Sequence, residues 1–232
     1  MEFDEISNDS IITNLSDDQN ESNFLFDTEE FTYTPKIEEF EPKIINVVSS
    51  INLGCNLNIK NLVLKFKNAE YNSSKSSTIS LKSKNSKISA TIFSGGKMIC
   101  TGAKSEKEAK SECMKFSKIF KKTGYNVELK DFKIQNIVAS YDINFKISLF
   151  TLCSIICNLI NNSKILGNNN NYCKYNKAIF PGLIFYEEQS KISFNIFESG
   201  KVVLSGAKKR KDIEDAFRNI YPLLLESKMT KY

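Results

Sequence analysis

The six cysteines of the chain are its residues best suited to metal binding or thiol chemistry. Cys153 and Cys157 form a Cys-x3-Cys pair inside an apolar stretch, and Cys173 follows further along the chain. Thiolates are good zinc ligands, but a pair at this spacing on an apolar helix is more often a packing feature. The other three show no regular spacing, and no two cysteines form a Cys-x2-Cys motif. We therefore expect free thiols, no metal site and no cofactor.

Histidine is absent from all 232 residues, which removes the commonest general acid–base catalyst and a common metal ligand. An enzyme would need a nucleophile paired with a base or a cluster of carboxylates, and no pair of acidic residues occurs within a shared motif. The sequence therefore argues against an enzyme.

Charge is divided sharply along the chain. Residues 1–42 hold 13 Asp and Glu residues against one Lys, and they show no apolar periodicity, which predicts an acidic, disordered N-terminal tail. The remainder holds 31 of the 32 Lys and Arg residues and 14 of the 27 acidic residues, a net charge of +17. A basic folded part favours a polyanionic partner, nucleic acid first, although lysine-rich surfaces also serve solubility.

The chain shows no sign of secretion or of a membrane span. The first 25 residues are acidic and polar, unlike the apolar core of a signal peptide. The longest apolar run, 147–160, has 14 residues, fewer than the roughly 20 that a transmembrane helix requires. We expect no membrane contact and an intracellular protein with reduced thiols.

A long internal repeat organises the basic part. The stretch IFSGGKMICTGAKSEK, from Ile92, recurs as IFESGKVVLSGAKKRK from Ile196, with eight of 16 positions identical. Upstream, IINVVSS (44–50) recurs as IQNIVAS (134–140), so the offset grows from 90 to 104 residues. The difference indicates an Asn-rich insertion around 158–174, which we expect to form a surface loop. The pattern predicts two half-domains, 43–132 and 133–232, packed about a pseudo-twofold axis.

Each repeat contains a predicted β-hairpin followed by an amphipathic helix. Residues 88–93 and 192–197 alternate in polarity, and a glycine-containing turn leads to return strands at 98–102 and 202–206. After the first hairpin, Ser105 begins a capping box and Gly124 ends the helix. The simplest architecture is α+β: two antiparallel half-sheets joined edge to edge, with helices covering one face.

Alternation predicts what lies on the other face. Ile88, Ala90 and Ile92 point toward the helices, whereas Phe93 and its repeat mate Phe197 point away. The same face receives Ser89, Thr91, Ile99, Thr101, Ser193, Asn195, Val203 and Ser205. An uncovered, partly apolar face bordered by lysines indicates an interaction surface. A register error of one residue would instead return both phenylalanines to the core.

Six motifs carry a family resemblance. INLGC, NAEYN, GKMICTGAKSE, DFKIQNIV, IFPGLIF and SGKVVLSGAK occur in this order between Lys43 and Met229. This set resembles the TATA-box-binding protein family. The resemblance implies a saddle-shaped pseudo-twofold α+β domain, with a curved antiparallel sheet and helices on its convex face. It also implies a general transcription initiation factor of the nucleus, which binds and bends A·T-rich promoter DNA through the minor groove. Its implied partners are transcription factors IIA and IIB and TATA-box-binding-protein-associated factors.

The resemblance assigns roles residue by residue. Asn46, Asn136, Thr101 and Ser205 are implied hydrogen-bond donors to the minor groove. Val48, Val138, Ile99 and Val203 are implied contacts with the groove floor. Phe93, Phe180 and Phe197 match wedge positions that unstack base steps. Lys82, Lys84, Lys97 and Lys201 are implied phosphate contacts.

The chain departs from the family pattern at several of these positions. Ser76 stands where a wedge phenylalanine is expected, as the repeat mate of Phe180, and Thr91 and Asn195 replace aliphatic groove residues. Before IFPGLIF, Asn176 and Ala178 lie in the segment where the family carries glutamates that contact transcription factor IIB. Two functions stay open: a promoter-binding initiation factor, or a divergent paralogue that acts mainly as a protein adapter with weak or altered DNA binding.

Overall fold

The computed structural model describes residues 40–66, 69–72, 77–83, 86–164 and 170–229. Nearly all of the predicted acidic tail therefore lies outside the described residues, and its disorder stays a prediction. Within the described ranges, no helix is long and apolar enough to cross a membrane.

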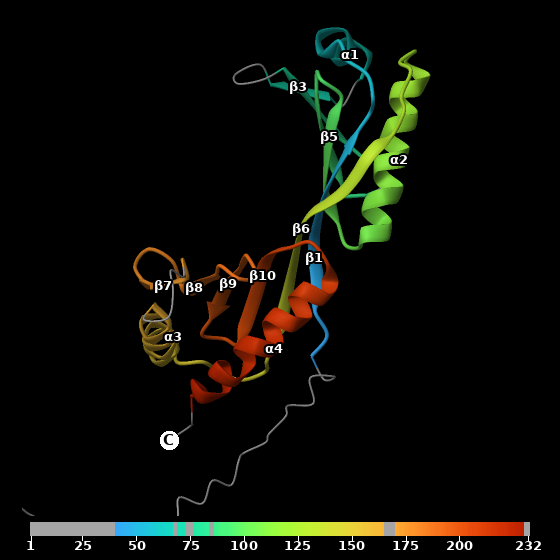
Figure 1. Cartoon of the computed structure of the whole chain (residues 1–232). Coiled ribbons are helices and arrows are strands. Elements are labelled where there is room, and N and C mark those ends of the chain that lie inside the picture. Colours follow the sequence, from blue (N-terminus) through green and yellow to red (C-terminus); the bar gives the residue numbers. More distant parts are fainter. Residues whose placement is uncertain (1–39, 67–68, 73–76, 84–85, 165–169, 230–232) are drawn as a thin grey trace, which may run out of the picture. The chain divides into compact units, whose positions relative to one another are not determined.

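In the part of the chain that the structure describes, ten strands form one antiparallel sheet in the order β2-β3-β4-β5-β1-β6-β10-β9-β8-β7. The sheet is curved and does not close on itself (Figure 1). The first half contributes β1 (Lys43–Asn52), β2 (Ala69–Asn72), β3 (Thr78–Lys82), β4 (Ser89–Phe93) and β5 (Lys97–Ala103). The second contributes β6 (Lys130–Asp142), β7 (Tyr172–Tyr175), β8 (Gly182–Glu187), β9 (Ile192–Phe197) and β10 (Lys201–Ala207). The order reads as two identical half-sheets that meet at the β1–β6 pair. The predicted edge-to-edge junction and fold class are confirmed.

Among the described residues, four helices pack on the buried side of the sheet. They are α1 (Ile59–Lys65), α2 (Glu106–Lys122), α3 (Leu149–Lys164) and α4 (Arg210–Glu226). Each half has its own core: α1 and α2 share one with the first half-sheet, and α3 and α4 share the other with the second. The amphipathic pattern of α2 and α4 exists because each helix must cover an apolar sheet surface on one side only.

The start of α2 differs slightly from its predicted capping box. Ser105 is the N-cap, and its hydroxyl accepts a hydrogen bond from the Glu108 amide at 3.1 Å. The Glu108 carboxylate, however, accepts from the Lys104 amide at 2.7 Å, one residue before the N-cap. The helix ends before Gly124, as predicted.

The predicted surface loop around the insertion is wrong at both ends. The helix α3 begins at Leu149, which is equivalent in the repeat to Ile59, the first residue of α1. It continues to Lys164, so the first residues of the predicted loop are helical. Residues 172–175 form the edge strand β7. Ile156 and Ile160 of α3 are buried in the core of the second half. Their packing stabilises the helix more than the low helix propensity of the asparagines destabilises it.

The repeated Gly-Ala-Lys motif marks a β-bulge in each half. Gly102 and Gly206 have φ angles of +106° and +114°, which favour glycine. At Gly206 the pairing of β10 with β6 shifts register, and at Gly102 that of β5 with β1 does so. A Cβ atom on Gly206 would lie 2.3 Å from the Lys191 carbonyl oxygen. Both glycines are therefore required by backbone geometry.

We expect Gly206→Ala to lower the free energy of unfolding by about 1–3 kcal/mol, because alanine strains this backbone and meets the Lys191 carbonyl. Urea denaturation measures the change. Gly95→Ala is the matched control, since a Cβ atom there has nothing within 4 Å. Equal shifts of the two variants would contradict the bulge requirement.

Candidate nucleic-acid interface

The strands place the predicted interaction residues on one face. In β9, Ile192, Phe194 and Ile196 are buried, whereas Ser193, Asn195 and Phe197 alternate with them and stay partly exposed. The hairpin of β4 and β5 shows the same alternation. Phe93 and Phe197 therefore lie outside the core, and the register error considered above did not occur. We call this surface the open face; it comprises Asn46, Val48, Ser89, Thr91, Phe93, Ile99, Thr101, Asn136, Val138, Ser193, Asn195, Phe197, Val203 and Ser205.

The centre of the open face is a symmetric group of four side chains. In the β1–β6 pair, Asn46 lies opposite Val138 and Val48 lies opposite Asn136. The repeat exchanges these two pairs, and the pseudo-twofold axis passes near the Val47–Ile137 pair between them. Residues 90 positions apart in sequence are thus brought together by the junction of the two half-sheets.

Both central asparagines are held by the same hydrogen bond. The backbone N–H of Gly102 donates to Oδ1 of Asn46 at 2.8 Å, and that of Gly206 donates to Oδ1 of Asn136 at 2.7 Å. Because an N–H requires an acceptor, these bonds fix which amide atom is oxygen. No described residue accepts a hydrogen bond from either NH2 group. Each bulge glycine therefore orients an asparagine as a hydrogen-bond donor.

Hydroxyl and aliphatic side chains flank this centre without any charge. The hydroxyls of Thr101 and Ser89 lie 3.1 Å apart on neighbouring strands. In the second half, Ser205 is paired with Ser193. Ile99 is paired with Thr91, and Val203 is paired with Asn195. Each aliphatic side chain therefore lies opposite a polar residue that replaces an aliphatic one of the family pattern.

Phe197, the last residue of β9, and Phe180, which lies just before β8, form an aromatic pair. Their ring centroids are 5.7 Å apart in an edge-to-face arrangement. Gly182, the residue opposite Phe197 on β8, makes this approach possible, because a Cβ atom there would lie 2.8 Å from the Phe180 ring. In the first half, Phe93 lies opposite Thr78, and Ser76 lies outside the described residues.

The predicted phosphate contacts lie in different surroundings. Lys97 and Lys201 are exposed at the first positions of β5 and β10. Lys82 forms an exposed ion pair with Glu70 on the neighbouring strand, with Nζ 2.8 Å from the carboxylate. The hydrogen bond within this pair raises the pKa of Lys82 and lowers that of Glu70. Lys84 lies outside the described residues.

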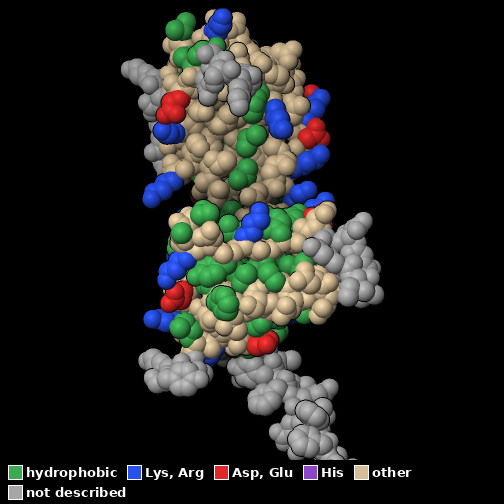
Figure 2. Space-filling view, turned by 90° about the vertical axis from the view of Figure 1, so that its left-hand side faces the viewer, with side chains coloured by type: hydrophobic (Ala, Val, Ile, Leu, Met, Phe, Trp, Pro, Cys, Tyr) green, Lys and Arg blue, Asp and Glu red, His purple; other side chains and the backbone are tan. Residues whose placement is uncertain are grey.

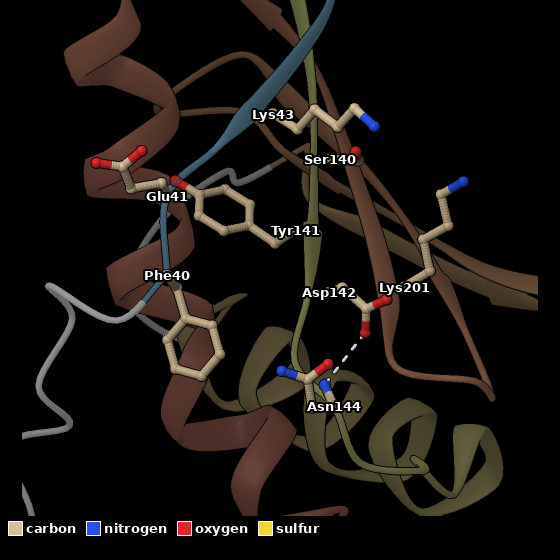
Figure 3. A pocket seen from close by; sticks show the side chains of 8 residues that line it. All are labelled: Phe40, Glu41, Lys43, Ser140, Tyr141, Asp142, Asn144 and Lys201. Atoms are coloured by element: carbon tan, nitrogen blue, oxygen red, sulfur yellow. Dashed lines mark hydrogen bonds between the residues drawn. The ribbon is translucent and has the colours of Figure 1, made fainter.

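A cavity of about 410 Å³ adjoins Lys201 (Figure 3). The side chains of Lys43 and Lys201 reach the same side of it, from strands that both pair with β6. The nearby carboxylate of Asp142 accepts a hydrogen bond from the Asn144 amide at 3.1 Å. Figure 2 looks toward the side of the sheet that α2 does not cover: hydrophobic side chains gather toward the middle, and several Lys and Arg side chains lie along the margins.

Comparisons with known proteins agree with this geometry. The family described as "Transcription factor TFIID (or TATA-binding protein, TBP)" matches residues 41–123 and 131–227. The TATA-box-binding protein of Acanthamoeba castellanii is 44% identical over 189 residues, which cover 82% of this chain and 68% of that protein. The one from Tetrahymena thermophila is 38% identical over 226 residues, covering 97% and 87%.

A solved structure gives the same result for the fold. The TBP of Methanococcus jannaschii superposes with a TM-score of 0.67 at 30% identity, over 81% of this chain and 99% of that one. Two matched repeats, relatives above 30% identity and a common fold all point the same way. The chain belongs to the TATA-box-binding protein family.

Proposed function

We propose that this protein binds the minor groove of A·T-rich, TATA-like promoter DNA through its open face, bends the DNA, and so nucleates assembly of the transcription preinitiation complex. Its relatives are named for binding the TATA box. The observation that carries the proposal for this chain is the pair of asparagines, Asn46 and Asn136. Each is anchored by its carbonyl oxygen, and among the described residues none accepts a hydrogen bond from its NH2 group. No enzymatic step is part of this function.

The chemistry of the open face suits an A·T-rich groove. Every base pair presents acceptors in the minor groove, and a G·C pair adds the protruding guanine amino group. The asparagine NH2 groups match the acceptors. Val48, Val138, Ile99 and Val203 offer no acceptor to a guanine amino group, which would lie unpaired against them. The open face therefore favours A·T pairs for two reasons: its asparagines can bond to their acceptors, and its aliphatic side chains leave the amino group of a G·C pair without a partner.

Lysines at the borders of the face supply the second part of the proposal. Lys97 and Lys201 begin the return strands of the two hairpins, in equivalent places in the two repeats. Two lysines so placed can meet the phosphates on both sides of a bound duplex, with Lys82 and Lys84 as further contacts. Each phosphate that is neutralised releases counterions, which makes binding depend steeply on salt.

Titrations of the full chain with two labelled duplexes test this function. We expect tighter binding to an A·T-rich duplex than to its G·C-substituted partner, a negative slope of log affinity against log salt, and increased energy transfer between end labels as the duplex bends. Equal affinities without a change in energy transfer would instead favour an adapter with weak DNA binding.

Partners and location follow as parts of the same proposal. We place the protein in the nucleus, with its repeats 43–132 and 133–232 each contacting one half of the bound site. Transcription factors IIA and IIB and the associated factors are the proposed partners. Asn176 and Ala178 are exposed where the family carries glutamates, so we expect the factor IIB contact to be weaker here.

Removing the partner of Lys82 should strengthen DNA binding. At neutral pH the Glu70 carboxylate is ionised and pairs with Lys82, in competition with a phosphate. We expect Glu70→Gln to raise affinity a few-fold and to steepen the salt dependence, as measured by the same titrations. Glu214→Gln is the control, because it breaks an equally short pair with Arg210 on α4, against the other face of the sheet. A similar gain in both variants would indicate a net-charge effect only.

A further inference from the structure

The fold brings a third cysteine, Cys173, beside the Cys-x3-Cys pair of Cys153 and Cys157. Cys153 and Cys157 lie on α3 with their sulfur atoms 4.0 Å apart, and Cys173 on the edge strand β7 lies 3.7 Å from Cys153. All three sulfur atoms are within 4.8 Å of one another. The third member changes the interpretation of the Cys-x3-Cys pair, which by itself indicated only packing.

These separations are those of thiolates around one zinc ion. A Zn–S bond of about 2.3 Å in tetrahedral geometry places neighbouring sulfur atoms roughly 3.8 Å apart. Two of the three pairs already have this separation. The third pair needs to close by less than about 1 Å, which rotation of a cysteine side chain supplies.

The surroundings also suit an ion. All three cysteines are partly exposed, so that an ion has a path of entry. Within the described ranges, no carboxylate or further thiol joins the group, and the sequence has no histidine. A set of three sulfur ligands selects a soft or borderline cation over Mg²⁺ or Ca²⁺. The fourth tetrahedral position is left for water or an external thiol.

We propose that Cys153, Cys157 and Cys173 form a zinc site with three thiolate ligands. Each thiol gives up its proton to solvent when the ion binds. The ion links α3 to β7 across the segment between Cys157 and Cys173, which contains most of the insertion. Its role is structural: it fastens the outermost strand of the sheet to the helix beside it and closes the loop between them. Unlike the open face, this site has no counterpart in the first repeat, where Val63 and Lys67 stand at the positions of Cys153 and Cys157.

Cobalt(II) is the probe for this site. The full chain, reduced with a phosphine so that no thiol is added, is titrated with Co(II) without oxygen. We expect thiolate-to-cobalt charge-transfer and tetrahedral d–d absorption that saturate at one ion per chain and are displaced by Zn(II). Cys153→Ser, Cys157→Ser and Cys173→Ser should each lose most of this absorption. Cys55→Ser, at a partly exposed cysteine outside the group, should keep it.

Alkylation of the protein without substitutions gives a second measurement, which holds even if a cysteine variant fails to fold. Zn(II) should slow alkylation of the peptides that carry Cys153, Cys157 and Cys173, as followed by mass spectrometry, and leave Cys55 unchanged. Absence of cobalt absorption, or equal alkylation of all these cysteines with and without zinc, would overturn the site. Loss of the absorption in Cys55→Ser as well would overturn the assignment of ligands.

Discussion

Replacing Asn136 with Asp will weaken binding to an A·T-rich duplex by about ten- to one-hundredfold and leave the fold intact. The carboxylate can still accept the hydrogen bond from the Gly206 amide, so the bulge keeps its partner. The donor NH2 group is lost, and an anion faces the acceptors of the minor groove, a loss of about 1–3 kcal/mol. Titration with the labelled duplex measures the affinity, and urea denaturation measures the fold. Asn46→Asp should behave alike, because the repeat gives it the same bond to Gly102.

The control must separate a local donor from a general charge effect. Asn61→Asp makes the same chemical change on the exposed surface of α1, which packs on the buried side of the sheet. We expect it to change affinity by less than about threefold, as for a remote charge in salt. If Asn61→Asp and Asn136→Asp lost affinity equally, the asparagines of the open face would be ordinary surface residues.

Periodicity within each repeat was enough to predict the sheet and its two faces. Strand positions alternate strictly, so the buried set that includes Ile192 and Ile196 determined where Phe197 must point. The internal repeat further predicted that the two halves join edge to edge. The repeated segments IINVVSS and IQNIVAS lie in β1 and β6, the two strands that pair at the junction. These features depend on local pattern and on comparison of the chain with itself.

Features that depend on contacts between distant segments were not predictable. The Asn-rich tract gave no sign that α3 continues to Lys164, since its helix is stabilised by core contacts of Ile156 and Ile160. Nothing in the spacing of Cys173 placed it beside Cys153, because β7 reaches α3 only through the fold. The bonds from the bulge glycines to the asparagines span 56 and 70 residues. The one available signal for them was the recurrence of Asn and Gly in both repeats.

Replacing Phe197 with Ala will reduce the bend of the bound duplex and speed its dissociation. As a wedge, the ring fills the space that opens when two neighbouring base pairs unstack. Unstacking a step costs a few kcal/mol, and without the ring no protein contact compensates for it. We expect an affinity loss of about 1–3 kcal/mol, or roughly five- to 150-fold. Energy transfer between labels on the duplex ends reports the bend, and stopped-flow dilution reports the dissociation rate.

Asn195→Ala is the matched control, because Asn195 lies two residues earlier on β9 and on the same face, without an aromatic ring. It should leave the bend nearly unchanged. Phe180→Ala should reduce the bend as Phe197→Ala does, and the double variant should lose less than the sum of the two, because the rings contact each other and act on one base step. Equal energy transfer in the unmodified protein and in Phe197→Ala would show that the pair is no wedge. Because Phe197 is partly exposed rather than buried, its removal leaves no core cavity, and a changed bend can then be read as an effect on the DNA alone.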